Sequence, residues 1–415
     1  MNMNEQGTEG RIKVEYMCLF FYIKIMVQKQ RIYTLCIILI ACFSCIPGWP
    51  LCTLPDDNPS DVYIIEGINA ATNFDFSTAH ENFTQLHNLD NNHPAPYFYF
   101  GWLLTRMQDF YMNKDYNDIL RYLKYADSLA DKKLKQHPNN IEALFYKAAS
   151  KALVAYIDGL KESWWNAAQA GKSMRSYSKK IIELQPDNPD ALYFLGTYDY
   201  FSDSLPAAQK FIRTLLLIPG GNKERGLHEL QEVSEKGYYT KIEAKRTLLI
   251  IYVYFEKDCE HAENIAFNLM EEFPNNPFFR LMLSQCYYMK KEWQQSAKIL
   301  EDVPDSISYL KKYGYSSLLY EIKYWLARTY LHLEEYQQAE TILLTIIQDK
   351  PKEPAWLYQW ALLSLAQCYD IQGDEKHSMI YYRKALQIKN YKDAHSKIKW
   401  RLSRRTVLLL EYTDY

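Results

Sequence analysis

The chain has 415 residues, and its 48 Lys and Arg nearly balance its 50 Asp and Glu, for a formal net charge of -2. This balance excludes the strongly basic surface of a general nucleic-acid-binding protein. Glycine and proline make up about 7% of the residues against about 12% in an average protein, which argues against an all-β chain, a glycine-rich nucleotide fold and a disordered protein. With 36 Tyr, 18 Phe and 9 Trp available for a large core, helices with aromatic faces are expected.

Residues 26–52 have the composition of an export signal. Lys29 and Arg31 precede an uncharged apolar stretch over 32–46, and the chain then breaks at the Pro-Gly-Trp-Pro of residues 47–50. A cationic start, a short apolar run and a breaker are typical of a signal peptide. The run is shorter than the roughly 20 residues of a membrane span, so an uncleaved anchor is the alternative.

Two details of this region bear on the start and the anchoring of the chain. Residues 1–25 add nothing to a signal, so we interpret them as an upstream extension and Met26 as the natural start. The Leu-Ile-Ala-Cys of residues 39–42 resembles the bacterial lipobox, which predicts lipidation of Cys42, with ordinary cleavage nearby as the alternative. We therefore expect an exported protein of the bacterial envelope, periplasmic or membrane-anchored, with secretion as a further alternative. In a eukaryotic cell Asn82 would instead become a glycan acceptor.

Beyond residue 53 the chain repeats itself. Four junctions carry a proline after one amphipathic run and before the next, and they begin at His137, Gln185, Phe273 and Lys350. Proline ends one helix, Asn or Asp caps the next, and a second proline suits the first helical turn. These segments are predicted helix-to-helix junctions.

The spacing between the junctions indicates the repeat unit. Ala126, Ala262 and Ala339 each stand twelve residues before a junction proline, where a small residue lets two helices approach closely. Ala262 recurs 34 residues later as Ser296, and Leu-Ala-x-x-Tyr occurs at both 326–330 and 365–369.

These positions resemble the tetratricopeptide repeat family, whose first helix carries a large, a small and an aromatic residue and whose second helix ends at a proline. The resemblance implies an all-α fold, a right-handed α-solenoid of stacked helix-turn-helix units. The arrangement also resembles bacterial exported repeat proteins related to the mitochondrial outer-membrane repeat family. The expected units are 60–93, 107–140, 155–188, 189–222, 243–276, 277–310, 320–353 and 359–392.

The units group into three regions behind the signal. In the region 53–238, we expect longer helices over 95–112 and 141–160 to replace the regular first helix of two repeats. Residues 220–237 are expected to be an insertion with its own helix. The apolar residues 407–410 are expected to pack back on the last repeat. The regions are 53–238 with degenerate repeats, 239–392 with clear tetratricopeptide repeats, and 393–415 with a capping helix and tail.

Motifs that carry chemistry are scarce. The Ala-Gly-Lys-Ser of residues 170–173 lacks the first glycine of a phosphate-binding loop, because Asn166 stands there. None of the nine histidines forms a His-x-x-x-His pair. Cys259, Cys286 and Cys368 lie among apolar residues and are expected to be buried rather than disulfide-bonded. We therefore predict no catalytic, cofactor or metal site.

What remains is the groove that the resemblance implies, lined by fixed places of each first helix. Its aromatic residues would form pockets and Arg328 would anchor a carboxylate, while the alternative is that half of these aromatics pack between repeats. Chaperone-tail-binding members of the family use Lys and Asn in a carboxylate clamp. The ninth position of the four clearest first helices holds Ile251, Gln285, Arg328 and Gln367, so no Asn is present there, which argues against such a clamp. Carried over onto this chain, the groove residues are Tyr254, Phe255, Phe278, Leu281, Gln285, Tyr288, Met289, Tyr324, Arg328, His332, Trp360, Leu363, Gln367 and Asp370.

The sequence thus predicts a non-enzymatic protein-protein interaction scaffold of the cell envelope that binds a peptide or protein partner in this groove. The alternative is a small-molecule or lipid-binding accessory component of an envelope transport system. No cofactor and no nucleic-acid partner is expected, and membrane association would run through the N-terminus.

Overall fold

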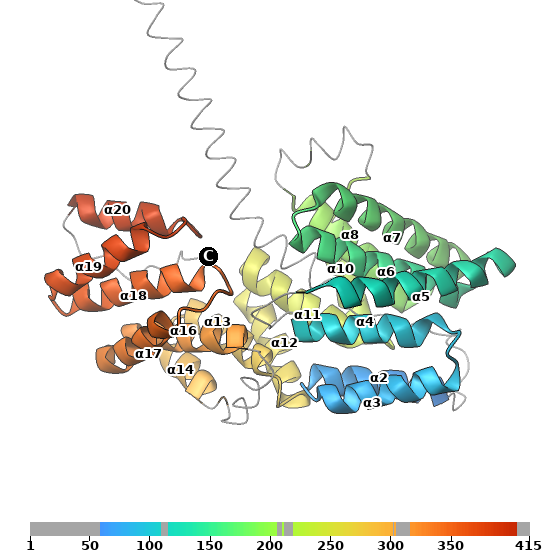
Figure 1. The fold of residues 1–415 in the computed structure, drawn as a ribbon, viewed down its shortest axis with the longest axis horizontal. Helices are drawn as coiled ribbons and strands as arrows, with labels where there is room; N and C mark the ends of the chain where they lie inside the picture. Colours follow the sequence, from blue (N-terminus) through green and yellow to red (C-terminus); the bar gives the residue numbers. More distant parts are fainter. Residues whose placement is uncertain are drawn as a thin grey trace, which may run out of the picture.

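The protein, seen in a computed structural model, is described over residues 59–108, 115–205, 210, 219–301, 303 and 316–404. Every regular element in these stretches is a helix, and the helices follow one another as stacked pairs (Figure 1). This confirms the expected all-α solenoid of tetratricopeptide-like pairs. None of the described helices is both long and apolar enough to cross a membrane. The predicted signal over 26–52, with Cys42, and the apolar residues 407–410 lie outside the described residues.

Each pair consists of a first and a second helix that pack against each other. The fifth first helix, α11, continues into a π-helix, η1, and α20 closes the array. The pairs are α2 (Pro59–Thr72) with α3 (Phe76–Leu89), α4 (Pro94–Gln108) with α5 (Asn117–Gln136), α6 (Ile141–Leu160) with α7 (Trp164–Leu184), α8 (Pro189–Asp203) with α10 (Lys223–Lys236), α11 (Lys241–Ile250) and η1 (Ile251–Glu256) with α12 (Cys259–Glu272), α13 (Pro277–Met289) with α14 (Trp293–Glu301), α16 (Ser316–His332) with α17 (Tyr336–Asp349), and α18 (Leu357–Ile371) with α19 (Glu375–Leu386), followed by α20 (Ala394–Arg404).

The predicted junctions start helices as expected. The Asn140 side chain accepts a hydrogen bond from Ala143 N at 2.8 Å, and the Asn188 side chain accepts one from Ala191 N at 3.0 Å. These bonds satisfy backbone donors that the first helical turn would leave unpaired. The range of α6 matches the predicted long first helix over 141–160.

The fourth pair corrects the prediction that 220–237 is an insertion. Its helix, α10, packs against α8 and is the second helix of that pair. Two glycines explain the close crossing: a Cβ on Gly196 would lie 3.0 Å from the Gly226 carbonyl oxygen, and a Cβ on Gly226 would lie 2.5 Å from the Gly196 oxygen. Any larger residue would place its Cβ against the facing backbone, so glycine at both positions lets the backbones of the two helices come into contact here.

The turn inside most pairs places one residue in the left-handed region. Lys257 and Lys291, one repeat apart, have φ of 56° and 66°, and Gly373 has φ of 80°. A residue with a capping side chain follows: Asp258 accepts from His261 N at 3.1 Å, and Asp374 accepts from His377 N at 3.0 Å. A left-handed residue followed by an N-cap therefore reverses the chain with few residues.

Small and hydroxyl-bearing side chains join the helices inside and between repeats. Ala126, Ala262 and Ala339 are fully buried, as their spacing predicts. Ser296, which replaces alanine in its repeat, is also buried, and its hydroxyl lies 2.9 Å from the Ser284 hydroxyl. Burial of this serine is tolerated because its polar atoms are hydrogen-bonded.

Tyrosines of the Leu-Ala-x-x-Tyr motif connect neighbouring repeats. The Tyr330 hydroxyl donates to Glu301 at 2.7 Å, and the Tyr369 hydroxyl donates to Glu340 at 2.6 Å. Each bond runs from a first helix to the second helix of the preceding pair. The same contact thus recurs at the same register in two successive interfaces.

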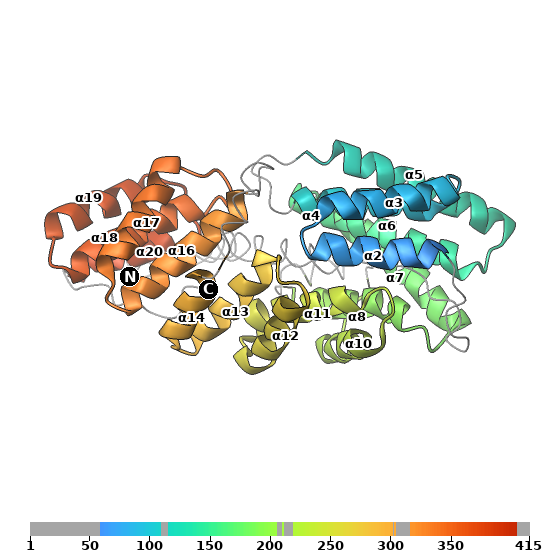
Figure 2. The ribbon, with the colours of Figure 1, turned by 90° about the horizontal axis from the view of Figure 1, so that it is seen from below.

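Contacts far apart in sequence close the part of the array from α2 to the start of α13, which we call the N-terminal half. The turn after α2 meets the turn before α13: Asn275 N donates to Asn73 Oδ1 at 3.0 Å, and Asn276 Nδ2 donates to the Thr72 carbonyl at 2.7 Å. Arg106 of α4 forms a buried ion pair with Glu243 of α11. The α2–α3 hairpin accordingly ends beside α12 (Figures 1 and 2). We call these contacts the seam.

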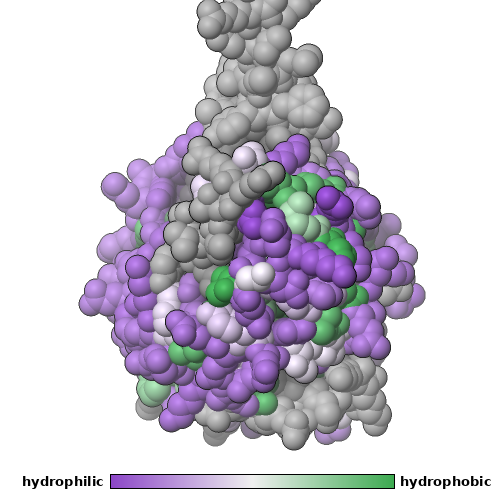
Figure 3. All heavy atoms as spheres, turned by 90° about the vertical axis from the view of Figure 1, so that its left-hand side faces the viewer, coloured by the Kyte–Doolittle hydropathy of each residue, from purple (hydrophilic) through white to green (hydrophobic). Residues whose placement is uncertain are grey.

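The predicted capping helix is confirmed as α20, and a buried ion pair holds it. Arg401 Nε lies 2.7 Å from Asp370 Oδ2, and Arg401 Nη2 lies 2.9 Å from Asp370 Oδ1. The Tyr382 hydroxyl donates to the same carboxylate at 2.8 Å. Hydrophilic residues cover most of the described surface that is visible at this end (Figure 3), as expected where an array stops stacking.

Candidate partner-binding wall

The clearest of the predicted groove residues lie on three neighbouring first helices, α13, α16 and α18, which contact one another in order. We call this surface the wall. Gln285, Arg328 and Gln367 stand at the same place of the repeat, one on each helix. All three side chains are buried, with exposed fractions of 3%, 1% and 2%. The sequence therefore identified one row of polar groups that the structure brings together.

Arg328 joins the three helices. Its Nη2 donates to the Tyr288 hydroxyl of α13 at 3.0 Å, and its Nη1 donates to Gln367 Oε1 of α18 at 3.2 Å. The Tyr288 hydroxyl also lies 2.9 Å from His332 Nε2. These two bonds fix the orientation of the guanidinium across the three helices. A fixed guanidinium fork is the group that best matches a carboxylate.

Gln285 differs from its neighbours in the row. Its Oε1 is buried and has no hydrogen-bond partner in the part of the chain that the structure describes. A buried carbonyl without a donor costs about 1–3 kcal/mol. A ligand N–H that reached this oxygen would recover that cost, so Gln285 marks a place where the wall is incomplete.

Aromatic side chains surround the row. Tyr288 packs edge-on against Trp325, with ring centroids 5.1 Å apart, and the His332 ring stacks on Trp293 at 4.0 Å. The Tyr324 ring lies 5.3 Å from the Trp356 ring. Trp293, Trp325 and Trp356 were not among the predicted residues, since they stand outside the places carried over from the family.

Other predicted groove residues hold the array together. Trp360 is 2% exposed, and its indole Nε1 donates to the Tyr391 carbonyl at 3.0 Å, which fixes the turn before α20. Asp370 belongs to the ion pair with Arg401. The Arg246 guanidinium lies over the Phe278 ring, 5.2 Å from the ring centroid, next to the seam. These contacts are of the kind expected if half of the groove residues pack between repeats.

Tyr254 and Phe255 lie apart from the wall, on the π-helix η1. Phe255 packs against Tyr200 and Phe201 of α8, with ring centroids 6.1 and 5.9 Å away. A π-helix shifts the side chains that follow it relative to an α-helix. The places carried over from a regular repeat therefore lead to a different surface here.

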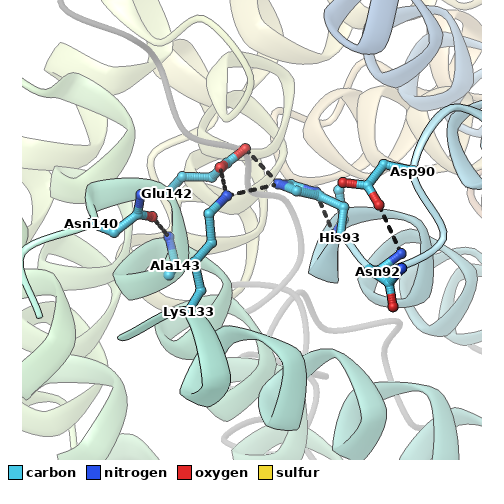
Figure 4. Close-up of polar contacts among 8 residues, drawn as sticks. Asp90, Asn92, His93, Lys133, Asn140, Glu142 and Ala143 are labelled. Atoms are coloured by element: carbon cyan, nitrogen blue, oxygen red, sulfur yellow. Dashed lines mark hydrogen bonds and ion pairs between the residues drawn. The ribbon is translucent and has the colours of Figure 1, made fainter. Parts of the chain in front are cut away.

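A second polar cluster, shown in Figure 4, joins the second and third pairs. His93 Nε2 lies 2.9 Å from Glu142 Oε1, and Lys133 Nζ lies 2.6 Å from Glu142 Oε2. His93 Nδ1 accepts from Ala95 N at 3.2 Å, which leaves the ring proton on Nε2, facing Glu142. Burial alone would raise the pKa of Glu142, but His93 and Lys133 outweigh it and lower that pKa to about 2. Because both carboxylate oxygens are engaged, this cluster is a structural junction.

Cysteine and histidine chemistry adds no site in the described stretches. Cys286 and Cys368 are buried as predicted, Cys259 is half-buried, and all three are free thiols. Burial raises the pKa of the Cys286 thiol. No group of His, Cys, Asp and Glu side chains among the described residues could hold a metal ion. Asn82 is 9% exposed and donates to the Thr78 carbonyl within α3, so the folded chain leaves little access for a glycan.

Comparisons with known proteins show remote similarities of fold. No family model and no curated protein matches the chain. Among solved structures, the human IFIT1 dimer with m7Gppp-AAAA is 14% identical, covers 85% of this chain and 88% of its own, and has a TM-score of 0.45. Yeast Tom70 is 11% identical over 85% and 90%, with a TM-score of 0.37. A tetratricopeptide repeat protein from Parabacteroides merdae is 12% identical over 82% and 97%, with a TM-score of 0.23. All three TM-scores are below 0.5, and the fold is defined by the helix pairs of the chain itself.

Proposed function

We propose that the protein is a non-enzymatic interaction scaffold that binds a peptide segment of a partner protein along α13, α16 and α18. The observation that carries this proposal is the unpartnered Oε1 of Gln285, 3% exposed, in the same row as the Arg328 guanidinium. A carbonyl that needs a donor beside a guanidinium that favours a carboxylate is a combination suited to a peptide. Because both side chains are buried in the unbound chain, neighbouring side chains would have to move for a backbone N–H to reach Gln285 and for an acidic side chain or a C-terminal carboxylate to reach Arg328.

The aromatic surroundings support the same partner class. The rings of Tyr288, Trp325 and Tyr324 would flank an apolar side chain of the bound segment. Aromatic residues and arginine are the groups that most often dominate binding energy at protein interfaces. The near-zero net charge of the chain supports a protein rather than a nucleic acid as partner.

Selection from a random peptide library on the purified protein tests this proposal. We expect enrichment of peptides that carry Asp, Glu or a free C-terminal carboxylate near an apolar residue. Arg328→Gln should remove the acidic preference, because the neutral amide does not attract a carboxylate as the guanidinium does. Arg383→Gln, an exposed arginine on α19, is the matched control and should select the same peptides as the unaltered chain. Unchanged selection by Arg328→Gln would reject the wall as the site.

Gln285→Glu provides the complementary test on the neighbouring helix. A carboxylate at this place would still accept an N–H, but it would repel an acidic peptide and compete with that peptide for the Arg328 guanidinium. We expect the selected peptides to bind this variant at least about tenfold more weakly, a loss equivalent to one hydrogen bond to a charged group. A single-stranded oligoadenylate serves as the nucleic-acid control, and tight, salt-sensitive binding of that RNA would contradict the partner class.

We further propose that this scaffold works in a bacterial cell envelope. Support comes from the sequence of residues 26–52 and from the lipobox-like tetrapeptide ending at Cys42. Mass spectrometry of the N-terminal peptide from the native cell tests this location. A lipid-modified Cys42 or a new N-terminus near residue 52 is expected, whereas a mature form that retains Asn4 or Glu5 would reject export through this segment.

A further inference from the structure

A pocket of about 760 Å³ opens between α3, α4 and α5. These helices are distant in sequence from the wall helices α13, α16 and α18. The turn before α3 and the turn before α13 border it, so the pocket lies at the seam. Leu103, Leu104 and Met107 of α4 are its aliphatic lining. Its aromatic lining consists of Phe74, Phe76, Phe100 and Tyr122.

The rings line the pocket in two groups. Phe74 and Phe76 lie with ring centroids 5.2 Å apart, and Phe100 and Tyr122 lie 5.6 Å apart. The His80 ring adds to the second group, 5.4 Å from Phe100. Faces of aromatic rings are electron-rich and attract cations, most strongly where several rings share one desolvated site.

The charges around the pocket favour the same sign of ligand. Among the described residues that line it, the ionisable side chains are Asp75, His80 and Tyr122, and none is Lys or Arg. The Arg121 guanidinium, outside this lining, lies 6.0 Å from the centroid of the Tyr122 ring, so the other rings and Asp75 carry the preference for a cation. The Asp75 carboxylate caps α3 by accepting from Thr78 N at 3.1 Å, and this bond holds it at the edge of the pocket. A positively charged group is the ligand chemistry that this carboxylate and these rings complement.

Phe74 shows that the lining differs from the ordinary repeat turn. It has φ of 65° at the place where other pairs carry Lys257, Lys291, Glu334 or Gly373. A bulky residue in this region costs about 1–2 kcal/mol relative to glycine. Yet Phe74 is only 5% exposed and lines the pocket, so its packing there offsets the cost.

We propose that this pocket binds an amphipathic organic cation, a quaternary or protonated amine with a short apolar body. The cationic group would lie against the aromatic rings beside Asp75, and the apolar body would pack on Leu103 and Met107 of α4. Asn73 and Asn275, which hydrogen-bond across the seam, both border the pocket, so the proposed site has both sides of the closure at its edge. This site is independent of peptide binding at the wall.

A series of three ligands with equal chains tests the proposal on the unaltered protein. Isothermal titration with hexyltrimethylammonium, hexanol and hexanoate isolates the charge from the apolar body. We expect one site for the ammonium compound, with hexanol about tenfold weaker and hexanoate weaker still. Binding of the ammonium compound should also raise Tm with its concentration. Equal binding of all three, or no binding of the ammonium compound at millimolar concentration, would overturn the proposal.

Two variants, Asp75→Asn and Tyr122→Leu, and one control variant locate the site. Asp75→Asn removes the charge but keeps the helix cap, since Asn caps as well as Asp. Asp374→Asn makes the same change at the equivalent cap of the eighth pair, where Asp374 accepts from His377 N, and serves as the control. We expect Asp75→Asn, and likewise Tyr122→Leu, to weaken hexyltrimethylammonium by about five- to tenfold and Asp374→Asn to leave it unchanged. Equal affinities for all of these proteins would place the cation elsewhere and reject this pocket.

Discussion

The N-terminal and C-terminal halves use the same helix pairs but differ in how far their contacts reach along the chain. In the N-terminal half, Asn73 meets Asn275 and Arg106 meets Glu243 across several repeats. In the C-terminal half, the main contacts of α16 to α20 join elements that are close in sequence. An array with neighbour contacts alone gains stability repeat by repeat. The seam adds a contact that exists only when all intervening repeats are folded, so the N-terminal half should unfold more cooperatively.

Among the variants that test the difference between the two halves, Arg106→Met is expected to have the largest effect, because it removes the buried ion pair of the seam. It leaves the Glu243 carboxylate buried, with the Arg246 guanidinium 3.9 Å away as a weaker partner. We expect a loss of about 3–5 kcal/mol in the free energy of unfolding, with hydrogen exchange accelerated in α2 to α4 and in α11 but not in α17 to α19.

The matched control for this change is Arg121→Met on α5. Arg121 pairs with Asp118 at 3.0 Å, but the two side chains are 74% and 69% exposed, so we expect a loss below about 1 kcal/mol. If Arg106→Met loosened both halves equally, the seam would not distinguish them.

Arg401→Met tests the opposite end. It removes both hydrogen bonds to Asp370 and leaves that carboxylate with the Tyr382 hydroxyl as its remaining partner in this group. We expect a loss of about 3 kcal/mol, confined by hydrogen exchange to α18, α19 and α20. Lys399→Met, exposed on the same helix, should have little effect. Loosening that spread to α2 would show coupling between the two ends and remove the distinction drawn above.

Glu142→Gln tests a second contact of the N-terminal half, whose contribution to stability depends on pH. The folded pKa of Glu142, about 2, lies below its ordinary value of 4.5, so the carboxylate contributes stability above pH 4.5 that is lost as pH falls toward 2. We expect the variant to be less stable by roughly 2 kcal/mol at pH 7, allowing for partial exposure, and by much less at pH 3. Urea unfolding of both proteins at several pH values measures this, with Glu183→Gln on α7 as control. A constant difference across the pH range would contradict the assignment.

Tyr330→Phe and Tyr369→Phe are the smallest changes and test whether the C-terminal interfaces are equivalent. Each removes one hydrogen bond to a glutamate of the preceding pair. We expect each to cost about 1 kcal/mol and the double variant to cost the sum, as for independent neighbour contacts. Tyr381→Phe, whose ring stacks on Tyr369 at 5.7 Å, keeps that stacking and should be nearly neutral. Strong non-additivity would show that the two interfaces are coupled.

Much of the helical pattern was predictable because its causes are local. Proline, Asn caps and small residues act within a few positions, so the junctions near Asn140 and Asn188 and the buried Ala262 were found without a structure. The pairing of α10 with α8 was missed because it depends on Gly196 and Gly226, which lie in different helices. The prediction of the wall was partly local as well: the repeat register placed Gln285, Arg328 and Gln367 in one row, whereas Trp360 turned out to anchor the closing turn.

The sequence by itself determined the class of the fold, the starts of most helices and the register that aligns the wall, since each follows from residues one repeat apart or less. Only the tertiary structure decided the seam and its pocket, whose partners such as Thr72 and Asn276 are joined by no sequence period. It also decided that Gln285 is buried with an unpartnered oxygen. Solvation depends on every neighbour in space, and a linear pattern records only the neighbours along the chain.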